Sequence, residues 1–275
     1  VHDVNRGIAD ELVKAGATWA DSPQSVAEQS EVICTSLPGP AEAEAVSLGE
    51  EGIARGAVVG AIFIDLTTNS ARLVHRMYAA LAERGVAMLD APVSGGVEAA
   101  KRGELTILIG GDREILAAAK PVLDQLAQAV LHVGEIGAAS ICKALHNCAV
   151  FCANWATMEC LTAGVKAGVD AATLIETFQK SGLGRNLDLQ VAMPATLFRG
   201  NFQPRFAMKT ACKDMGLAME LAQTVDVPMK MAELCETEMA EAVRRGWGSQ
   251  DNTIFLTLQE ERAGVKVRIE DESHG

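Results

Sequence analysis

Two short segments carry the side chains best suited to chemistry, and the first is Asp90-Ala91-Pro92-Val93-Ser94-Gly95-Gly96. It follows an apolar run directly and combines small residues with a hydroxyl. Consecutive small residues let backbone N–H groups converge on one point, and Ser94 adds another donor, so the segment can hold a carboxylate or a phosphate. Glycine and proline are also general turn residues, so a plain tight turn is the alternative. We predict an anion-binding cradle over 90–96.

The second segment starts with Gly134 and Gly137 and continues into a helical pattern that carries Lys143 and Asn147. Residues four apart share one helix face, so this face would carry a proton carrier and an amide. Removing a hydride from an alcohol carbon requires a base for the hydroxyl proton, and a lysine buried beside other cations can have its pKa lowered enough to serve. Taken alone, a helical lysine is usually a solvated surface residue.

Three other groups of residues are weaker candidates for a site. Lys209 and Lys213 lie on one helical stretch and could place a second positive charge near Lys143, although surface ion pairing with Asp214 is the alternative. Cys142 and His146 have helical spacing but no further ligand is apparent, so no metal site is predicted. Ser94 lacks both a G-x-S-x-G context and a nearby histidine, which disfavours a nucleophilic serine.

The elements that must position these residues change in type along the chain. In the first half, β-rich runs alternate with helical stretches, which is typical of βαβ units and a largely parallel sheet. The expected strands are 1–3, 32–37, 61–66, 86–91, 105–109 and 130–133, and the clearest helices are 5–15, 70–84 and 112–126. From Gly137 on, only helical patterns follow, starting with a long helix over about 138–167. The chain is therefore predicted to be α/β, with a Rossmann-like parallel-sheet domain over 1–137 and an all-helical domain over 138–275.

Composition excludes several classes of function. The net charge of −12 disfavours association with nucleic acid, because such binding depends on clustered Lys and Arg. No continuous apolar run approaches the roughly 20 residues that cross a bilayer, so no membrane partner is expected. The seven cysteines are odd in number and form no C-x-x-C pair, which suits a reducing compartment and predicts a cytoplasmic protein.

The first residues fit the second strand of a dinucleotide-binding fold. Residues 1–6 read as an apolar strand that ends in Asp3 and leads into a helix. In such folds this acid hydrogen-bonds the adenosine ribose, about 20 residues after the glycine-rich turn. We expect that turn to precede Val1, or else the protein lacks its pyrophosphate loop. An ordinary aspartate at a helix start is the alternative for Asp3.

Taken together, residues 90–96, residues 134–147 and the pair Lys213-Asp214 resemble the β-hydroxyacid dehydrogenase family, of the 3-hydroxyisobutyrate dehydrogenase and tartronate semialdehyde reductase type. The likeness covers nearly the whole chain, in the same order and spacing. It implies a nicotinamide-dependent enzyme that oxidises a small β-hydroxy acid or reduces the matching semialdehyde, in a cleft between the two domains. A homodimer or homotetramer is expected.

The resemblance also implies a role for individual residues. Lys143 would be the general base in oxidation and the general acid in reduction, and the substrate would bind at Ser94, Gly95, Gly96 and Asn147. The cofactor contacts would be Asp3, Leu37, Pro38, Thr68 and Lys213. Thr67-Thr68 stands where the family usually has Ser-Thr, which retains the hydroxyls. NAD is expected because Asp3 would repel an added phosphate, with NADP as the alternative because Arg6 lies nearby.

Two rival functions fit parts of the same pattern. A non-catalytic binding or scaffolding homologue would explain an absent glycine-rich turn, but it would leave the joint presence of Lys143, Asn147 and Ser94 unexplained. A related reductase of glyoxylate-type, imine or phosphosugar-acid substrates would keep the fold. Imine reductases differ at the lysine position and phosphogluconate enzymes have a longer helical domain, so a small unphosphorylated acid is preferred.

Overall fold

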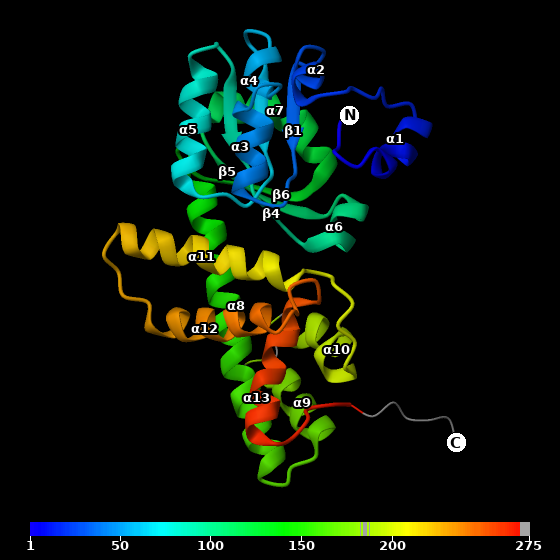
Figure 1. Cartoon of the computed structure of the whole chain (residues 1–275), viewed down its shortest axis with the longest axis vertical. Coiled ribbons are helices and arrows are strands. Elements are labelled where there is room, and N and C mark those ends of the chain that lie inside the picture. The colour runs from blue at the N-terminus through cyan, green and yellow to red at the C-terminus, as the bar shows by residue number, and fades with distance from the viewer. Residues whose placement is uncertain (182, 184–185, 187, 270–275) are drawn as a thin grey trace. The chain divides into compact units, whose positions relative to one another are not determined.

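The computed structural model describes residues 1–181, 183, 186 and 188–269. The chain divides into two compact units, Val1–Ala144 and Leu145–Gly275 (Figure 1). The first unit is built on a six-stranded sheet, and the described part of the second is helical. The division falls within one long helix, whose first turns belong to the first unit.

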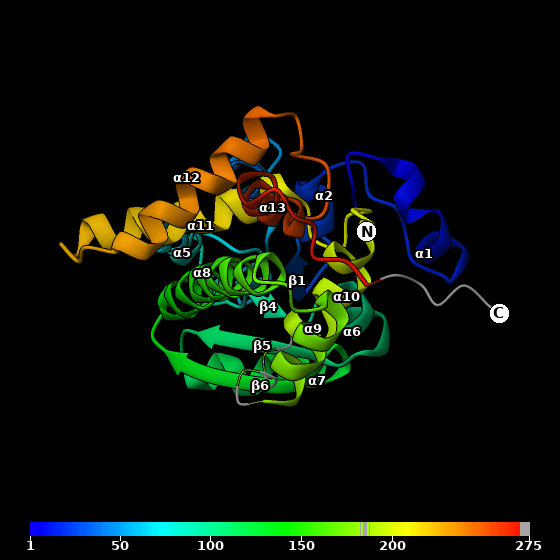
Figure 2. The ribbon, with the colours of Figure 1, turned by 90° about the horizontal axis from the view of Figure 1, so that it is seen from below.

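The sheet of the first unit is mixed, not wholly parallel. Its strands are β1 (Val32–Thr35), β2 (Ile62–Asp65), β3 (Ala87–Asp90), β4 (Val93–Ser94), β5 (Leu105–Gly110) and β6 (Ala127–Gly134). β1, β2 and β3 pair in parallel, as do β5 and β6, which lie side by side in Figure 2. β5 pairs antiparallel with both β3 and β4. The sequence predicted the α/β class and five of these strands, whereas the short β4 was not expected.

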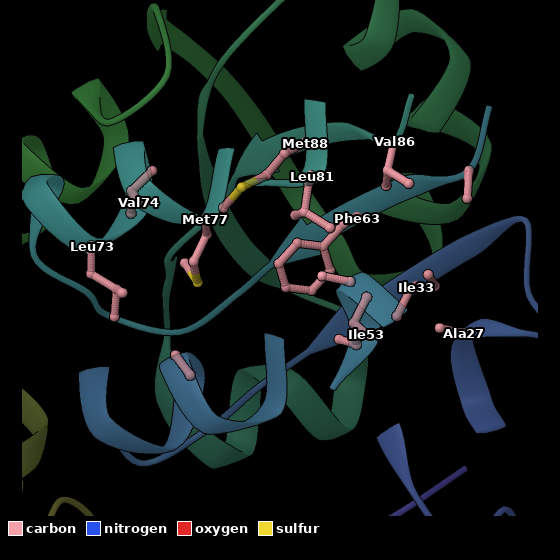
Figure 3. Packing of buried hydrophobic residues seen from close by; sticks show 13 residues of the cluster. Ala27, Ile33, Ile53, Phe63, Leu73, Val74, Met77, Leu81, Val86 and Met88 are labelled. Atoms are coloured by element: carbon pink, nitrogen blue, oxygen red, sulfur yellow. The ribbon is translucent and has the colours of Figure 1, made fainter. Parts of the chain in front are cut away.

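Two apolar cores cover the two faces of this sheet, because successive side chains of a strand point to opposite faces. Phe63 and Met88 belong to one core, and their neighbours Ile64 and Leu89 belong to the other. Figure 3 shows Phe63 packed in the first core. The helices of this unit are η1 (Arg6–Ala9), α1 (Asp10–Lys14), α2 (Pro23–Ala27), α3 (Pro40–Leu48), α4 (Ile53–Gly56), α5 (Ala71–Ala82), α6 (Gly96–Arg102) and α7 (Arg113–Leu126).

Helix starts in the first unit follow their capping residues. The side chain of Ser70 accepts the N–H of Leu73 at the start of α5, and Asp112 accepts the N–H of Glu114 at the start of α7. Such caps satisfy backbone donors that have no partner within the helix. The helices predicted over 70–84 and 112–126 are therefore confirmed, and the helix predicted over 5–15 forms as η1 followed by α1.

The strand predicted over residues 1–3 is wrong. The Val1 amino group donates to the carbonyl of Thr18, and the Val1 carbonyl accepts the N–H of Ala20. The segment thus pairs with a nearby loop and forms no ladder with the sheet. An apolar pattern alone cannot distinguish a sheet strand from an extended segment, because strand formation requires a neighbouring strand.

The described part of the second unit contains no strand, which agrees with the helical pattern read from the sequence. Its main helices are the later part of α8 (Ala138–Lys166), with α9 (Ala171–Lys180), α10 (Met193–Ala195), α11 (Met208–Thr224), α12 (Lys230–Arg244) and α13 (Thr257–Ala263). α11 and α12 pack side by side (Figure 1). The long helix predicted over about 138–167 is therefore confirmed.

Helix α8 is apolar over much of its 29 residues. An 18-residue window reaches a mean hydropathy of 1.2, so by length and composition this helix of the described chain could cross a membrane. This average is high although the helix contains no uninterrupted apolar run of that length. Core helices of soluble proteins pass the same test, and Phe151, Trp155 and Met158 of α8 are buried within the protein.

Candidate functional site

Two buried aspartates lie side by side at the carboxyl ends of adjacent strands. The pairing register aligns Thr35 of β1 with Asp65 of β2, and Asp65 with Asp90 of β3. Both carboxyl groups are about 1% exposed. In open parallel sheets, ligands bind outside the carboxyl ends of the strands. The loops that leave this edge are therefore the expected place for a cofactor. The two aspartates hold the neighbouring backbone and side chains by hydrogen bonds.

Asp65 connects the loops that follow β1 and β2. Its carboxylate accepts the hydroxyl of Thr35 at 2.8 Å, the backbone N–H of Thr67 at 3.1 Å and the side-chain amide of Asn69 at 2.5 Å. Thr67 then accepts the N–H of Leu37 at 3.1 Å. Burial raises the pKa of Asp65, and these donors act against that rise. The network fixes the backbone on either side of the predicted cofactor residues.

The Asp90 carboxylate contacts the first turn of α8. One carboxylate oxygen accepts the backbone N–H of Ser140 at 2.8 Å, and the other accepts the Ser140 hydroxyl at 2.7 Å. Burial raises the pKa of Asp90 to about 6, with Asp65 adding to the rise and the Ser140 bonds opposing it. Because this pKa is raised, the contribution of Asp90 to stability is greatest below pH 4 and is lost as the pH rises through about 6. The Asp90 carboxylate thus joins the end of β3 to α8, and the anion cradle over 90–96 stays a prediction.

Ser94, Gly95 and Gly96 form the exposed end of that cradle. Ser94 is half-buried and pairs with Thr106 of β5, so its backbone is set by the sheet. Gly95 and Gly96 are exposed and have φ angles of 129° and 68°, values that favour glycine. A Cβ at Gly95 would also lie 2.7 Å from the Cβ of Ala99. The backbone conformation therefore requires both glycines.

Lys143 and Asn147 lie one turn apart on the unbroken helix α8. Both residues are about 9% exposed. Lys143 is therefore not the solvated surface lysine that a helical pattern alone would suggest. Ser140, the residue that Asp90 holds, precedes Lys143 by three residues on the same helix. Among the described residues, no three His, Cys, Asp or Glu side chains are placed to hold a metal ion.

Asp214 is a functional candidate that the sequence reasoning did not assign. It is about 1% exposed on α11, and its carboxylate accepts the side-chain amide of Asn147 at 2.6 Å. Its other oxygen lies 2.7 Å from the ammonium of Lys213. A single buried carboxylate thus holds both a predicted substrate residue and a predicted cofactor residue. The only signal in the sequence was the adjacent Lys213-Asp214 pair.

The remaining predicted cofactor residues lie in the first unit. Leu37 is half-buried and Pro38 is exposed, and both follow β1; Thr68 is half-buried and follows β2. All three therefore lie just beyond the carboxyl ends of two paired parallel strands. Asp3 is half-buried, and one of its oxygens accepts the N–H of Asn5. The residue that caps η1 is Asn5, whose side chain accepts the N–H of Gly7, so the helix-start alternative for Asp3 is wrong. These residues suit the edge of a dinucleotide.

Two family models cover almost the whole chain. Residues 1–134 match the NAD binding domain of 6-phosphogluconate dehydrogenase. Residues 137–258 match the NAD-binding model of NADP-dependent 3-hydroxyisobutyrate dehydrogenase. The 2-(hydroxymethyl)glutarate dehydrogenase of Eubacterium barkeri is 33% identical over 257 residues, which are 93% of this chain and 85% of that protein. The chain belongs to the β-hydroxyacid dehydrogenase family.

Further relatives and solved structures are similar to this chain over most of its length. The NAD-dependent L-serine dehydrogenase of Pseudomonas aeruginosa is 30% identical over 94% of this chain and 88% of its own length. The structure of Mycobacterium tuberculosis 3-hydroxyisobutyrate dehydrogenase with L-serine has a TM-score of 0.82 at 25% identity, over 93% of this chain and 88% of that one. An imine reductase from Myxococcus stipitatus shares the fold at a TM-score of 0.59 and 19% identity, over 92% of this chain and 89% of that one.

Membership in the β-hydroxyacid dehydrogenase family confirms the predicted enzyme class and cofactor. The chain is an NAD(P)-dependent hydroxyacid dehydrogenase with a Rossmann-like first part and a helical second part. The rival functions, a non-catalytic homologue and an imine or phosphosugar-acid reductase, are not favoured by these relatives.

Proposed function

We propose that this dehydrogenase oxidises a small, unphosphorylated β-hydroxy acid, or reduces the matching semialdehyde, with Lys143 as the acid/base. The observation that carries the proposal is a buried lysine and a buried amide one turn apart on α8. A bound nicotinamide supplies the hydride acceptor for the alcohol carbon. During oxidation, Lys143 Nζ takes the hydroxyl proton as the carbonyl forms, and during reduction it returns that proton.

The substrate carboxylate is assigned to Ser94, Gly95 and Gly96. The hydroxyl of Ser94 and the N–H groups of the exposed glycines offer neutral donors to a carboxylate, and hydrogen bonds to a charged group are the stronger kind. Asn147 has one side-chain donor bound to Asp214, and its oxygen lies 3.2 Å from a ring nitrogen of His146. Its second amide hydrogen can therefore donate to the substrate, with the amide orientation fixed.

The cofactor is assigned to Asp3, Leu37, Pro38, Thr68 and Lys213. NAD is preferred because the second oxygen of Asp3 can accept from a ribose hydroxyl and would repel an added phosphate. Lys213 is assigned because its positive charge attracts a negatively charged cofactor, and its ion pair with Asp214 holds the ammonium in place. We also propose that the protein is cytoplasmic and forms a homodimer or homotetramer. Light scattering would measure the mass of this assembly in solution.

Titration calorimetry of this chain with NAD and with NADP tests the cofactor assignment. Tighter binding of NAD than of NADP, followed by NAD reduction with small β-hydroxy acids, is the expected result. Failure of the protein to bind either dinucleotide would contradict the proposed function. A panel of 3-hydroxy acids and their phosphorylated analogues would then define the substrate class.

Ser94→Ala is expected to lower kcat/KM for the hydroxy acid by about tenfold, because one hydrogen bond to a charged group contributes about 1.5 kcal/mol or more. The loss should appear mainly in KM, since the carboxylate is bound in both the ground state and the transition state. Steady-state kinetics at saturating NAD would measure it. Thr106→Ala, which alters the residue opposite Ser94 in the sheet, is the matched control. An unchanged KM in Ser94→Ala would remove Ser94 from the carboxylate site.

A further inference from the structure

The carboxyl end of β3 and the first turn of α8 are joined directly by Asp90 and Ser140, which are 50 residues apart in sequence. The contact is buried, with both side chains about 1% exposed. The start of α8 also packs against the end of β5, because a Cβ built on Gly110 would lie 2.8 Å from the Glu135 carbonyl and 3.1 Å from the Ala139 nitrogen. The first turn of α8 is therefore seated on the sheet with little freedom to shift.

The contact places a carboxylate at a helix N-terminus, where backbone N–H groups lack partners within the helix. A negative charge is favourable there, because the helix dipole is positive at that end. Burial and the neighbouring Asp65 on β2 raise the pKa of Asp90 to about 6, while the two bonds from Ser140 act against that rise. Asp90 therefore acts as a cap for α8 that is supplied by the sheet.

We propose that Asp90 is a positioning residue for Lys143. The carboxylate holds Ser140, one turn before Lys143, and Asp90 itself precedes Ser94 by only four residues. One residue thus links the strand that leads into the carboxylate-binding segment with the helix that carries the acid/base. This inference rests on the proposed function, in which Lys143 exchanges a proton with a substrate held at Ser94.

Asp90→Asn tests the inference with little change of shape. The amide has one acceptor oxygen, so it cannot accept both the N–H and the hydroxyl of Ser140 through separate oxygens as the carboxylate does. A displacement of a catalytic group by about 1 Å can cost up to about 10²-fold in rate. We expect kcat to fall about tenfold, with KM and the Kd for NAD within about twofold of wild type.

Ser140→Ala keeps the test decisive if Asp90→Asn folds poorly. Alanine favours the helix and removes only the hydroxyl bond, so a folded protein with a kcat several-fold below wild type is expected. The double variant should be no worse than the more affected single variant, because both changes break one contact. Two single variants that fold and retain the wild-type kcat would overturn the proposal, and so would fully additive losses.

Hydrogen exchange of the amides of residues 138–143 gives a readout that does not depend on activity. Protection should fall in Asp90→Asn and remain at the wild-type level in Asp65→Asn, which removes an equally buried carboxylate whose contacts lie in other loops. Unchanged protection in Asp90→Asn would overturn the inference. Wild-type turnover in Lys143→Ala would instead refute the proposed function, so the two failures are distinguishable.

Discussion

Lys143→Ala should lower kcat by about 10²-fold or more, because general acid/base catalysis contributes on that scale. Lys143 is nearly buried on α8. The alanine variant should therefore have no side chain at this position that can take the proton of the substrate hydroxyl. The Kd for NAD should change little, since none of the proposed cofactor residues is altered. Steady-state and single-turnover kinetics at saturating cofactor would measure the effect.

Lys143→Arg separates proton transfer from positive charge. Arginine keeps the charge but does not lose its proton in proteins, so this variant should be about as slow as Lys143→Ala. Lys120→Ala removes an exposed lysine of α7 and serves as the matched control, with turnover expected at the wild-type level. Unchanged turnover in Lys143→Ala, with the fold verified by circular dichroism, would remove Lys143 from the mechanism.

The parts of the fold that follow from local patterns were predictable. Strands β1, β2 and β3 are short apolar runs between helix signals, and helices α5 and α7 begin at capping residues that the sequence shows directly. The 29-residue helix α8 follows two loop glycines and lacks any internal proline. Patterns of this kind depend on neighbours along the chain, which is why a single sequence reveals them.

The parts that depend on distant partners were not predictable. Asp90 read as the first residue of an anion cradle, because nothing near it shows that its carboxylate meets Ser140, 50 residues further on. Asp65 likewise contacts Thr35, 30 residues before it. The short strand β4 forms because it pairs with β5. Residues 1–3 have no neighbouring strand to pair with among the strands of the sheet, so they form none. The contacts of buried polar groups with residues distant in sequence are thus the main features that could not be predicted from the sequence.

Asp214→Ala should reduce both stability and activity. The carboxylate is almost fully buried and holds the amide of Asn147 and the ammonium of Lys213, so its removal leaves a buried donor and a partly buried cation without this partner. Breaking such contacts costs about 2–3 kcal/mol, with Lys213 discounted for its partial exposure to solvent. The thermal midpoint should therefore fall, and kcat/KM should drop by about 10-fold to 100-fold as Asn147 loses its fixed orientation.

Asp214→Asn distinguishes positioning from simple packing. The asparagine oxygen can still accept from Asn147, but the charge opposite Lys213 is lost, so stability should recover in part while the Kd for NAD stays weakened. Gln223→Ala removes an exposed side chain from the same helix α11, and it should leave both the thermal midpoint and kcat/KM close to wild type. Equal losses in Asp214→Asn and Asp214→Ala for stability and cofactor binding would mean that the charge alone matters. Wild-type kinetics in both variants would exclude Asp214 from positioning either Asn147 or Lys213.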